Sequence, residues 1–538
     1  MFRQLVTPVA DSLPMSFVVA ALPIVVVLFL LGIVRRPAWQ ASIAGVLVAL
    51  ALATGVWQMP VGLALNSIAA GATFAAWPVM WIVLNALLLY NVSVTSGSFD
   101  AFSGWMVRHL PNDRRVALIV IGFSFGCLLE GVAGFGTPIA ITSALLVTLG
   151  FPAIEAIVFT LMFNTAPVAF GALGSPITTL SAVTQLHDVS LAAMVGRQLP
   201  LIALLLPFYV IAVYGGVRAL RGVWPVLLVA GGSFAVMQFL SSNFLGYALT
   251  DVLSSLASLL CTLVFVKLWR MPADPAFALD APVHPAGTDG LVPGTSASGW
   301  KGWLPWLVLS ATVILWVHLK INTIGEMKVE WPGLHERIFI TTYGRAYGAI
   351  WSFQPLATGT AILVATIITA LLLRLSPGQL ATAIRRTLLQ LRLPLATTMT
   401  IIGLAYLMNY SGMAYTLGIG VASAGPLFPL VSAFLGWLAV FLSGSDTSGN
   451  ALFGNLQVVA ARQLDLNPVL MAATNASGGV LGKMVSPQNI STGTSTTDCR
   501  GQEGKILART FKHSIFLTLI LGCLVMVQQY VVPWIIPS

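Results

Sequence analysis

Long apolar runs constrain the fold of this chain more than any other feature of its sequence. Each is long enough, or nearly so, to cross a bilayer as a helix, which takes about 20 residues. The runs lie at 15–34, 38–56, 69–92, 195–214, 224–240, 247–266, 302–317, 355–373, 393–408, 426–442 and 513–535. Only 8% of the 538 residues are charged, too few to cover a soluble domain of this length. The sequence therefore predicts an all-α polytopic membrane protein.

Basic residues indicate how the chain is threaded. The net charge of +9 comes from Lys and Arg in short loops between the runs, which is typical of cytoplasmic loops, and not from a patch that would bind nucleic acid. The basic loops hold Arg35–Arg36, Arg108–Arg115, Arg218–Arg221, Lys267–Arg270, Arg374–Arg392 and Arg500–Lys512. The loop 318–354 mixes both charge signs and carries Trp331 and Trp351, so we expect it to be external.

The chain is expected to consist of two transmembrane halves, 1–270 and 301–538. Residues 271–300 between them are rich in Pro, Gly and Ala and are typical of a flexible linker. We expect this linker to be cytoplasmic because basic loops flank it.

Two stretches, 115–185 and 427–499, do not divide into simple spans, because Gly, Pro, Asn and Ser interrupt their apolar segments. Counted from the basic loops, the first starts inside and ends outside, and the second does the reverse. The simplest arrangement is one interrupted crossing plus one re-entrant hairpin in each, which makes the two stretches inverted repeats. This gives about 12 crossings with both termini external, and about fourteen full crossings is the alternative. The breaks should line a cavity, since unpaired backbone groups at membrane depth need protein or water partners.

A signature of Asn, Gly, Ser and Pro occurs once in each stretch. Asn164, Gly171, Ser175 and Pro176 recur as Asn475, Gly482, Ser486 and Pro487, all shifted by 311 positions. Helix packing through small residues explains the glycines, but it does not explain the matched asparagines and Ser-Pro pairs. We expect helix ends near Asn164 and Asn475, whose free N–H groups can hold a carboxylate. Doubled broken helices of this kind form the substrate site in many secondary transporters.

Glu130 is the only ionisable side chain in the run 122–148, and Gly131, Gly134, Gly136 and Pro138 follow it. Burying an ionised carboxylate costs several kcal/mol, so this group should be protonated, paired with a cation, or bound to an ion. Two interpretations stay open. Glu130 either carries a proton or is a structural carboxyl that accepts hydrogen bonds from amides exposed at a broken helix.

Asp446 is the corresponding carboxylate of the second stretch, and hydroxyl and amide side chains surround it. These are Ser443, Ser445, Thr447, Ser448 and Asn450. Their oxygens could coordinate a cation or bind a hydroxy acid. Equally, Asp446 and its serines could cap a helix N-terminus.

Lys483 breaks the symmetry of the repeat, because the equivalent residue in the first stretch is Ala172. It could neutralise a substrate carboxylate, pair with Asp446 or Glu130, or extend to the membrane interface. Arg197, at the start of an apolar run, is the other candidate for binding a carboxylate, although a span-end arginine also serves as an interface anchor.

Several other functions are disfavoured. The four cysteines are scattered and the histidines form no HExxH, so neither a disulfide framework nor a metal site is predicted. The sequence GFSFG from Gly122 fits a nucleophile elbow only as a pattern, since it lies in an expected membrane helix. Ser477 stands where a P-loop needs its first glycine. No cofactor is expected, with the proton as the coupling ion.

The same segments resemble the bacterial L-lactate permease family, which includes glycolate permeases. The matching words are LEGVAGFGTPIAIT from Leu129, NTAPVAFGALGSPI from Asn164, VGRQLP from Val195, GGSFAVMQFLSSNFLG from Gly231, FLSGSDTSGNALF from Phe441 and GKMVSPQNI from Gly482. The resemblance covers nearly the whole chain and implies proton-coupled uptake of lactate, and often glycolate, across the bacterial inner membrane. The hydroxyl-rich segment Ser491–Thr497 departs from the family pattern, and substrate preference could differ there.

These observations give the hypothesis of a proton symporter for 2-hydroxymonocarboxylates that works by alternating access. Helix-end amides near Asn164 and Asn475, with Lys483 or Arg197, would bind the carboxylate. Ser and Thr groups near Asp446 would bind the 2-hydroxyl, and Glu130 or Asp446 would carry the proton. The alternatives are a sodium-coupled symporter, an intramembrane enzyme that uses the two carboxylates, and a passive channel. The expected partners are a small carboxylate and the lipid bilayer, and the sequence does not indicate an oligomeric state.

Overall fold

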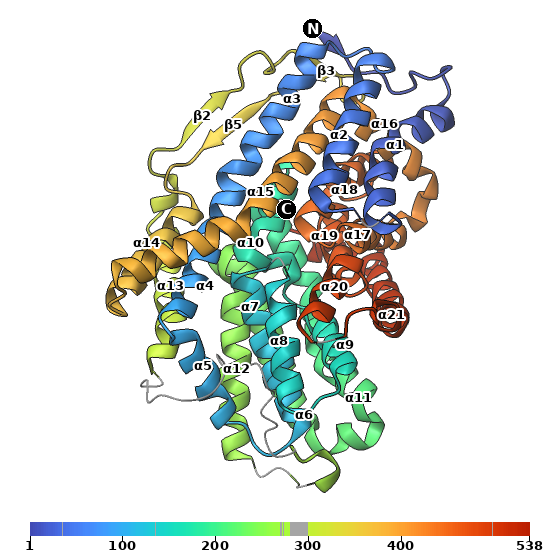
Figure 1. Ribbon diagram of the computed structural model, residues 1–538. Coiled ribbons are helices and arrows are strands. Elements are labelled where there is room, and N and C mark those ends of the chain that lie inside the picture. The colour runs from blue at the N-terminus through green and yellow to red at the C-terminus, as the bar shows by residue number, and fades with distance from the viewer. Residues whose placement is uncertain are drawn as a thin grey trace.

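The computed structural model describes residues 1–34, 36–134, 136–269, 272, 274–279, 300–497 and 499–537, and within them the chain is predominantly helical (Figure 1). Most of the expected linker 271–300 lies outside the described residues. Ten helices in the described part are long and apolar enough to cross a membrane, or eleven if a bent pair counts as one span. One of the ten, Asp188–Leu245, contains two helices that join at Gly215 and Gly216. The prediction of an all-α polytopic membrane protein is confirmed.

The helices of the first half precede the linker. They are α1 (Leu13–Gly32), α2 (Ala38–Gly55), α3 (Val61–Phe74), α4 (Trp81–Thr95), α5 (Ser98–Arg108), α6 (Arg114–Ala117), α7 (Gly126–Val132), α8 (Thr137–Thr148), α9 (Ala153–Phe163), α10 (Gly171–Thr184), α11 (Asp188–Leu240) and α12 (Thr250–Leu268). A π-helical stretch, η2 (Leu118–Phe125), joins α6 to α7, so the three form one continuous span.

The helices of the second half follow the linker. They are α13 (Trp300–His318), α14 (Thr358–Leu372), α15 (Pro377–Ser411), α16 (Met413–Val421), α17 (Phe428–Ser443), α18 (Asp446–Gln463), α19 (Pro468–Lys483), α20 (Pro487–Thr496) and α21 (Glu503–Tyr530).

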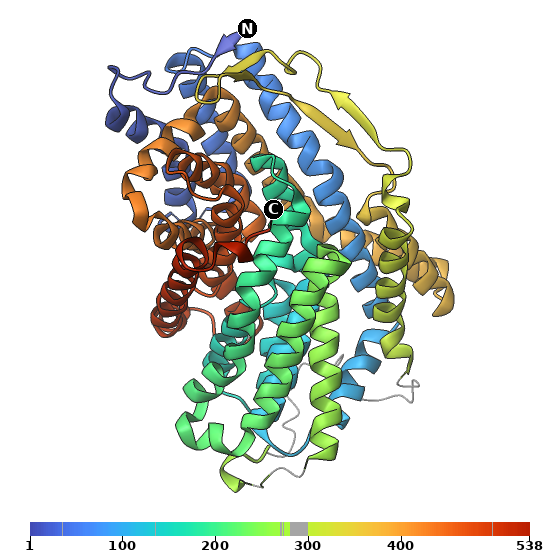
Figure 2. The ribbon, with the colours of Figure 1, turned by 180° about the vertical axis from the view of Figure 1, so that it is seen from behind.

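Short strands, which the sequence did not suggest, lie beside the N-terminus at one end of the molecule (Figures 1 and 2). They are β1 (Phe2–Arg3), β2 (Met327–Glu330), β3 (Ile338–Ile340), β4 (Arg345–Ala346) and β5 (Ile350–Phe353). β3 lies between a parallel β1 and an antiparallel β4, and β2 pairs with β5. The loop expected to be external is therefore a folded cap that also holds the N-terminus.

The two repeats use the same sequence of elements. A shift of 311 residues places the end of α7 on the end of α17, and it overlays α18 on α8, α19 on α9 and α20 on α10. In the first repeat α8 packs along both α7 and α9, and α9 is bent by 64° from the segment that contains α10. The bent pair is either a broken span or a re-entrant loop by its length and composition, so the division into one hairpin and one interrupted crossing stays a prediction.

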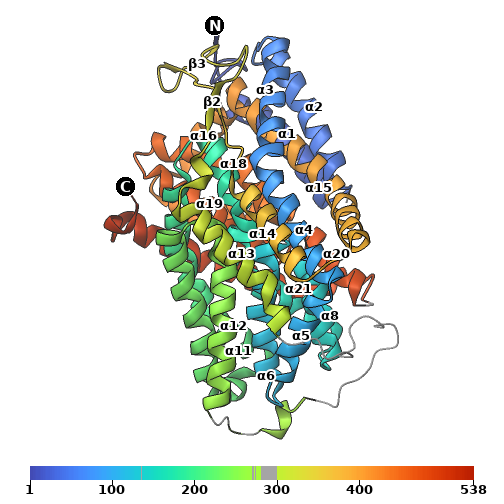
Figure 3. The same ribbon diagram turned by 90° about the vertical axis from the view of Figure 1, so that its left-hand side faces the viewer.

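The two halves of the sequence are interleaved in space. α15 of the second half packs against α2 and α3 of the first, and α14 packs against α4 (Figure 3). One hydrophobic core joins α7, α9, α11 and α12 to α17, α19 and α21, and a second joins α1–α3 to α15, α16 and α18. Van der Waals packing in both cores holds the repeats against each other, since lipid offers apolar side chains no less favourable surroundings than protein does.

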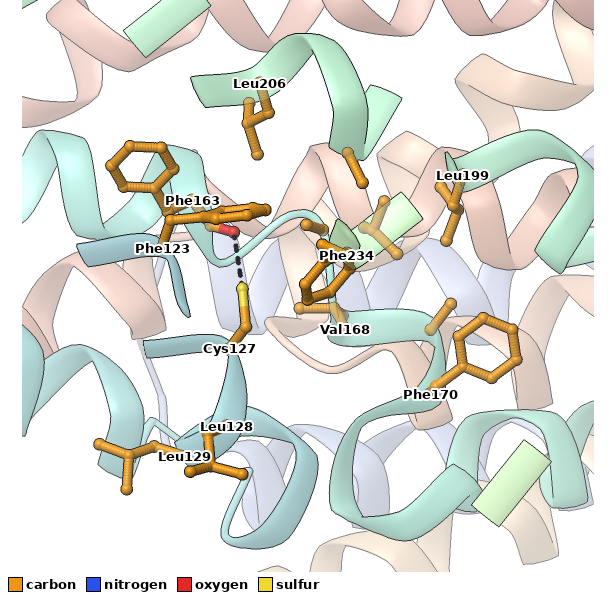
Figure 4. Close-up of a cluster of buried hydrophobic side chains, with 14 of the residues drawn as sticks. Phe123, Cys127, Leu128, Leu129, Phe163, Val168, Phe170, Leu199, Leu206 and Phe234 are labelled. Carbon is orange, nitrogen blue, oxygen red and sulfur yellow. Dashed lines mark hydrogen bonds between the residues drawn. The ribbon is translucent and has the colours of Figure 1, made fainter. Parts of the chain in front are cut away.

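Aromatic packing holds the span that ends at α7 (Figure 4). The ring of Phe123 lies 5.5 Å from that of Phe163 and 5.1 Å from that of Phe234, measured between centroids. The thiol of Cys127 donates to the carbonyl of Phe163 at 3.8 Å. These contacts tie the span to the end of α9 and to α11.

Candidate functional site

The breaks of the two repeats meet at one cavity of about 50 Å³. The first repeat lines it with Glu130, Gly134, Val168, Gly171, Ala172, Ser175 and Pro176, and the second with Gly444, Ser445, Asp446, Thr447, Lys483, Gln488 and Asn489. A cavity of this size holds a few water molecules or one small organic ion. The expectation that the breaks line a common cavity is met.

A buried ion pair crosses the cavity from one repeat to the other. The Nζ atom of Lys483 lies 2.6 Å from Oε1 of Glu130, and the two residues are only 5% and 3% exposed. The amide of Asn164 donates to Oε2 of Glu130 at 3.0 Å. A carboxylate with a cation on one oxygen and an amide on the other is compensated in its ionised form. Of the roles open to Lys483, pairing with Glu130 is the one observed.

This pair breaks the symmetry of the repeats. The 311-residue shift relates Glu130 to Phe441 and Lys483 to Ala172, so the residue equivalent to each charged one is uncharged in the other repeat. The glycines keep the symmetry: a Cβ atom on Gly171 would lie 3.1 Å from Oε1 of Glu130, and one on Gly482 would lie 2.9 Å from the backbone N of Phe441. Both glycines therefore allow a close approach between segments: Gly171 lies against Glu130 at the end of α7, and Gly482 lies against the backbone of α17.

Asp446 is held by amides rather than by a cation. Its Oδ2 accepts from Nδ2 of Asn450 at 3.3 Å, and Oδ1 of Asn450 accepts from Nδ2 of Asn475 at 2.9 Å. The same Asn450 amide donates to the carbonyl of Pro176 at 3.3 Å, across the repeats. Oδ1 of Asp446 has no hydrogen-bond partner. The paired asparagines thus have matching roles: Asn164 supports Glu130 directly, and Asn475 supports Asp446 through Asn450.

Three helix N-termini lie at or beside the cavity, and each contributes residues of its first turn to the lining. The Ser-Pro pairs begin two of them, α10 at Ser175 and Pro176 and α20 at Ser486 and Pro487, while Ser445 caps α18. Before Ser175 the residues Ala172, Leu173 and Gly174 have positive φ of 43°, 54° and 83°, so α10 is regular only from Ser175 onward. Unsatisfied N–H groups and the helix dipole make such N-termini favourable for anions.

One sequence-based expectation about these helices is wrong. Asn164 does end α9, but Asn475 lies inside α19, which continues to Lys483 and breaks only at Met484–Ser486. The difference follows from one position, because Pro167 follows Asn164 while the equivalent residue after Asn475 is Gly478. A proline ends a helix where glycine only weakens it.

The remaining predicted residues divide between the cavity and its support. Ser175 and Thr447 both line the cavity, and their hydroxyls lie 3.4 Å apart. Ser445 caps α18 by accepting from the backbone N–H of Ser448 at 3.4 Å, so the capping interpretation holds for this serine. Ser443 donates to backbone carbonyls at the end of α17. Ser448 and Ser486 are buried beside the cavity without lining it, and the Ser486 hydroxyl has no partner.

Arg197 does not lie at the cavity. It lies on α11, where its Nε donates to Oδ1 of Asn243 at 2.9 Å, and it lines a separate apolar groove with Leu201, Phe239 and Leu240. The structure therefore does not bring it together with Lys483. Its guanidinium also donates to the carbonyl of Ile535, so Arg197 joins α11 to the C-terminal segment.

Sequence reasoning missed three polar residues of this region. Gln488 and Asn489 line the cavity, and Asn489 donates to the carbonyl of Gly444 at 3.1 Å. Asp251, on the first turn of α12, is 1% exposed and packs against Gly131, where a Cβ atom would lie only 2.8 Å from that of Asp251. The signal for Asp251 was available, since it is a carboxylate within the apolar run 247–266, as Glu130 is within its own run.

A second, larger cavity of about 290 Å³ lies on the side of the small strands. Trp331, Trp351, Tyr347 and Tyr406 are among its lining residues, and Tyr247 and Thr178 are too. A Cβ atom on Gly174 would lie 2.6 Å from the Tyr247 ring. We call this larger cavity the vestibule and the cavity between the two repeats the inner cavity. The turn Ala172–Ser175 lies between them.

In the described residues no group of three or more His, Cys, Asp or Glu side chains is placed to hold a metal ion. The polar groups at the inner cavity are instead one cation, two carboxylates, hydroxyls, amides and helix N-termini. Such a set suits binding of a small organic anion better than covalent chemistry.

The sequence as a whole matches the family model described as L-lactate permease over residues 16–532. The chain belongs to the L-lactate permease family. It is 39% identical to the L-lactate permease of Bacillus subtilis (strain 168), with the whole of both chains covered. It is 37% identical to the glycolate permease GlcA of Escherichia coli (strain K12), with 97% of each chain covered. The resemblance seen in the motifs is therefore confirmed.

The fold is also similar to that of a solved transporter. The structure of Neisseria gonorrhoeae MtrF, from a class of antimetabolite efflux pumps, matches with a TM-score of 0.50 and 12% identity over 94% of this chain and 97% of that one. Family and fold agree on a multi-pass membrane transporter, and the chain is a permease rather than an enzyme.

Proposed function

We propose that this permease carries L-lactate and related 2-hydroxymonocarboxylates, D-lactate and glycolate, into the bacterial cell together with a proton, across the inner membrane and by alternating access. The relatives named above support the substrate class. The observation that carries the proposal is the buried Lys483–Glu130 pair at a small cavity onto which three helix N-termini converge.

The substrate carboxylate would bind to Lys483 and to the free N–H groups at the start of α10, α18 and α20. A cation and several helix N-termini together hold an anion in a low-dielectric site, where each interaction is stronger than in water. The 2-hydroxyl would meet the hydroxyls of Ser175 and Thr447, which come from different repeats and lie 3.4 Å apart. Recognition of that hydroxyl would separate lactate from acetate, because a missing partner leaves buried polar groups unpaired.

Proton coupling would result because the substrate carboxylate and Glu130 compete for Lys483. Without substrate, Glu130 neutralises the ammonium at 2.6 Å. When a substrate carboxylate takes Lys483, Glu130 becomes a buried carboxylate with only the Asn164 amide as partner, and it binds a proton to avoid that cost. One anion and one proton therefore enter together, and the loaded site carries the same net charge as the empty one.

Alternating access would expose the cavity to one side at a time. On the vestibule side, the turn Ala172–Ser175 and the Tyr247 ring block the route between the vestibule and the inner cavity. On the other side the lining residue Gln488 is exposed. In this scheme the route past α20 would be the more open of the two.

Uptake into proteoliposomes tests the proposal. An inward proton gradient should accumulate labelled L-lactate, D-lactate or glycolate above its external concentration, with the substrate recovered chemically unaltered. Accumulation that requires a sodium gradient and ignores the proton gradient would favour sodium coupling at Asp446, whose Oδ1 has no hydrogen-bond donor. Equilibration without accumulation under either gradient would indicate a passive channel.

A further inference from the structure

One buried carboxyl close to the cavity takes no part in the binding scheme above. Among the residues that the structure describes, neither oxygen of Asp251 has a hydrogen-bond partner, and Asp251 is 1% exposed. Although Asp251 lies in the first turn of α12, it accepts no hydrogen bond from the backbone N–H groups there. An ionised carboxylate with no partner is too costly in such surroundings, so this carboxyl holds a proton.

The surrounding charges agree with this protonation state. The titratable groups that act on Asp251 from the neighbouring elements are Glu130 and the Cys127 thiol on α7 and Lys483 on α19. Lys483 is the cation among these titratable side chains, and it already forms an ion pair with Glu130. A second ionised carboxylate would leave a net negative charge in the membrane interior, which ionisation of Glu130 alone avoids.

Buried hydroxyls continue from Asp251 along one face of α12. Ser255, Ser258 and Thr262 follow at intervals of four, three and four residues, all 0% exposed, so they lie on one side of the helix. Ser258 donates to the carbonyl of Ala230 at 3.0 Å and accepts from Ser124 of η2 at 2.8 Å, whereas the hydroxyls of Ser255 and Thr262 have no partner among the described residues. Unpartnered buried hydroxyls need an explanation, since most such groups are satisfied.

The row leads from the site toward the basic end of the helix. Successive members are about 4.5–6 Å apart along the axis, a gap that one ordered water bridges between two polar groups. The row ends five residues before Lys267, which belongs to a loop expected to be cytoplasmic. It does not touch the inner cavity, because neither Asp251 nor these hydroxyls line it.

We propose that Asp251 and the α12 hydroxyl row, defined as Ser255, Ser258 and Thr262, relay the coupled proton from Glu130 to the cytoplasm by a route separate from that of the substrate. After the substrate leaves, Lys483 returns to Glu130 and expels its proton. The O–H bond of Glu130 breaks and a bridging water passes that proton to one oxygen of Asp251, while the O–H proton that Asp251 already holds moves to the row. Each water or hydroxyl on the way gains one proton and loses one. One proton reaches the cytoplasm, and Asp251 ends protonated as it began. This relay rests on the proposed proton symport.

Comparing net uptake with exchange tests the relay. Exchange of labelled for unlabelled lactate needs no deprotonation of Glu130, whereas net uptake does. In Asp251→Asn proteoliposomes the initial rate of uptake driven by the proton gradient should fall at least roughly tenfold, as expected when a proton-transferring group is lost, while exchange stays within about twofold. Asp251→Glu, which keeps a titratable carboxyl, should restore part of the rate.

A second variant tests the row without changing the carboxyl. Ser255→Ala/Thr262→Val should also slow net uptake and spare exchange. Ser254→Ala is the matched control, because Ser254 is equally buried on α12 but donates to the carbonyl of Thr250 at 2.6 Å and lies off the row. If net uptake and exchange fall together, or neither changes, the relay is wrong and Asp251 is structural. If the unmodified protein shows no uptake driven by a proton gradient, the symport itself fails.

Discussion

Lys483 is the residue on which substrate binding depends in this scheme. Replacing it by Met removes the charge at similar length and leaves Glu130 buried without a cation, and loss of one partner of a buried pair costs about 3–5 kcal/mol. We expect Glu130 to become protonated and lactate binding to weaken at least roughly tenfold, since tenfold is about 1.4 kcal/mol. Lactate titration of the purified protein measures the affinity.

Lys483→Arg is the control for this prediction, because it keeps the charge while changing its geometry. It should retain more affinity than Lys483→Met. Equal affinity in Lys483→Met and the unmodified protein would remove Lys483 from the carboxylate site.

Gly479 illustrates how little room the second carboxylate has. A Cβ atom there would lie 2.3 Å from Oδ1 of Asp446 and 2.7 Å from a methyl group of Val440. Gly479→Ala should therefore displace Asp446 and lower both stability, by about 1–3 kcal/mol as overpacking does, and transport. Gly55→Ala, where a Cβ atom meets nothing within 4 Å, is the matched control. Melting temperature and lactate exchange measure both effects, and unchanged values for Gly479→Ala would contradict the packing described.

At the scale of elements, α20 joins the cavity to one surface of the protein. It starts at Ser486 beside the cavity, and Gln488, Ser491 and Ser495 on its length are exposed. Spacings of three and four residues place them on one face. A polar face at membrane depth belongs beside water rather than lipid, so we expect this face to line the inner route of the substrate.

Cysteine accessibility tests this position of α20. Ser491→Cys and Ser495→Cys should react with a membrane-impermeant thiol reagent from the cytoplasmic side, and lactate should slow the reaction. Cys127 and Cys499 are buried and serve as internal unreactive thiols, whereas the exposed Cys261 and Cys523 are first replaced by serine. Reaction only from the external side, or none at either cysteine, would contradict the inner route.

Much of the site was predictable at these two scales, and the part that was not has physical causes. The repeat identified Glu130, Asn164, Lys483 and the Ser-Pro helix starts because glycine, proline and buried charge leave strong local signals. Which residues face the cavity depends on how the two repeats meet, and that is set by packing between distant segments. The small strands were missed because their pairing joins residues near the N-terminus to the loop 318–354.

For the whole molecule, hydropathy and basic loops gave the class of protein and about the right number of spans. They did not give the interleaving of the two halves. α15 packs on α2 and α3, so the sequence halves do not correspond to separate bodies in space. This arrangement results from tertiary burial of apolar faces, which no local pattern specifies.

The whole-molecule claim is that a substrate carboxylate and Glu130 compete for Lys483, so that each bound anion brings in one proton. Binding of lactate to the purified protein across a range of pH, with proton uptake measured in the same calorimetric titration, tests it most directly. The unmodified protein should take up about one proton per lactate, and its affinity should rise about tenfold for each unit that the pH falls while Glu130 is ionised in the empty site. Glu130→Gln should bind lactate without proton uptake and with no such pH dependence. Proton uptake that persists undiminished in Glu130→Gln would contradict the competition.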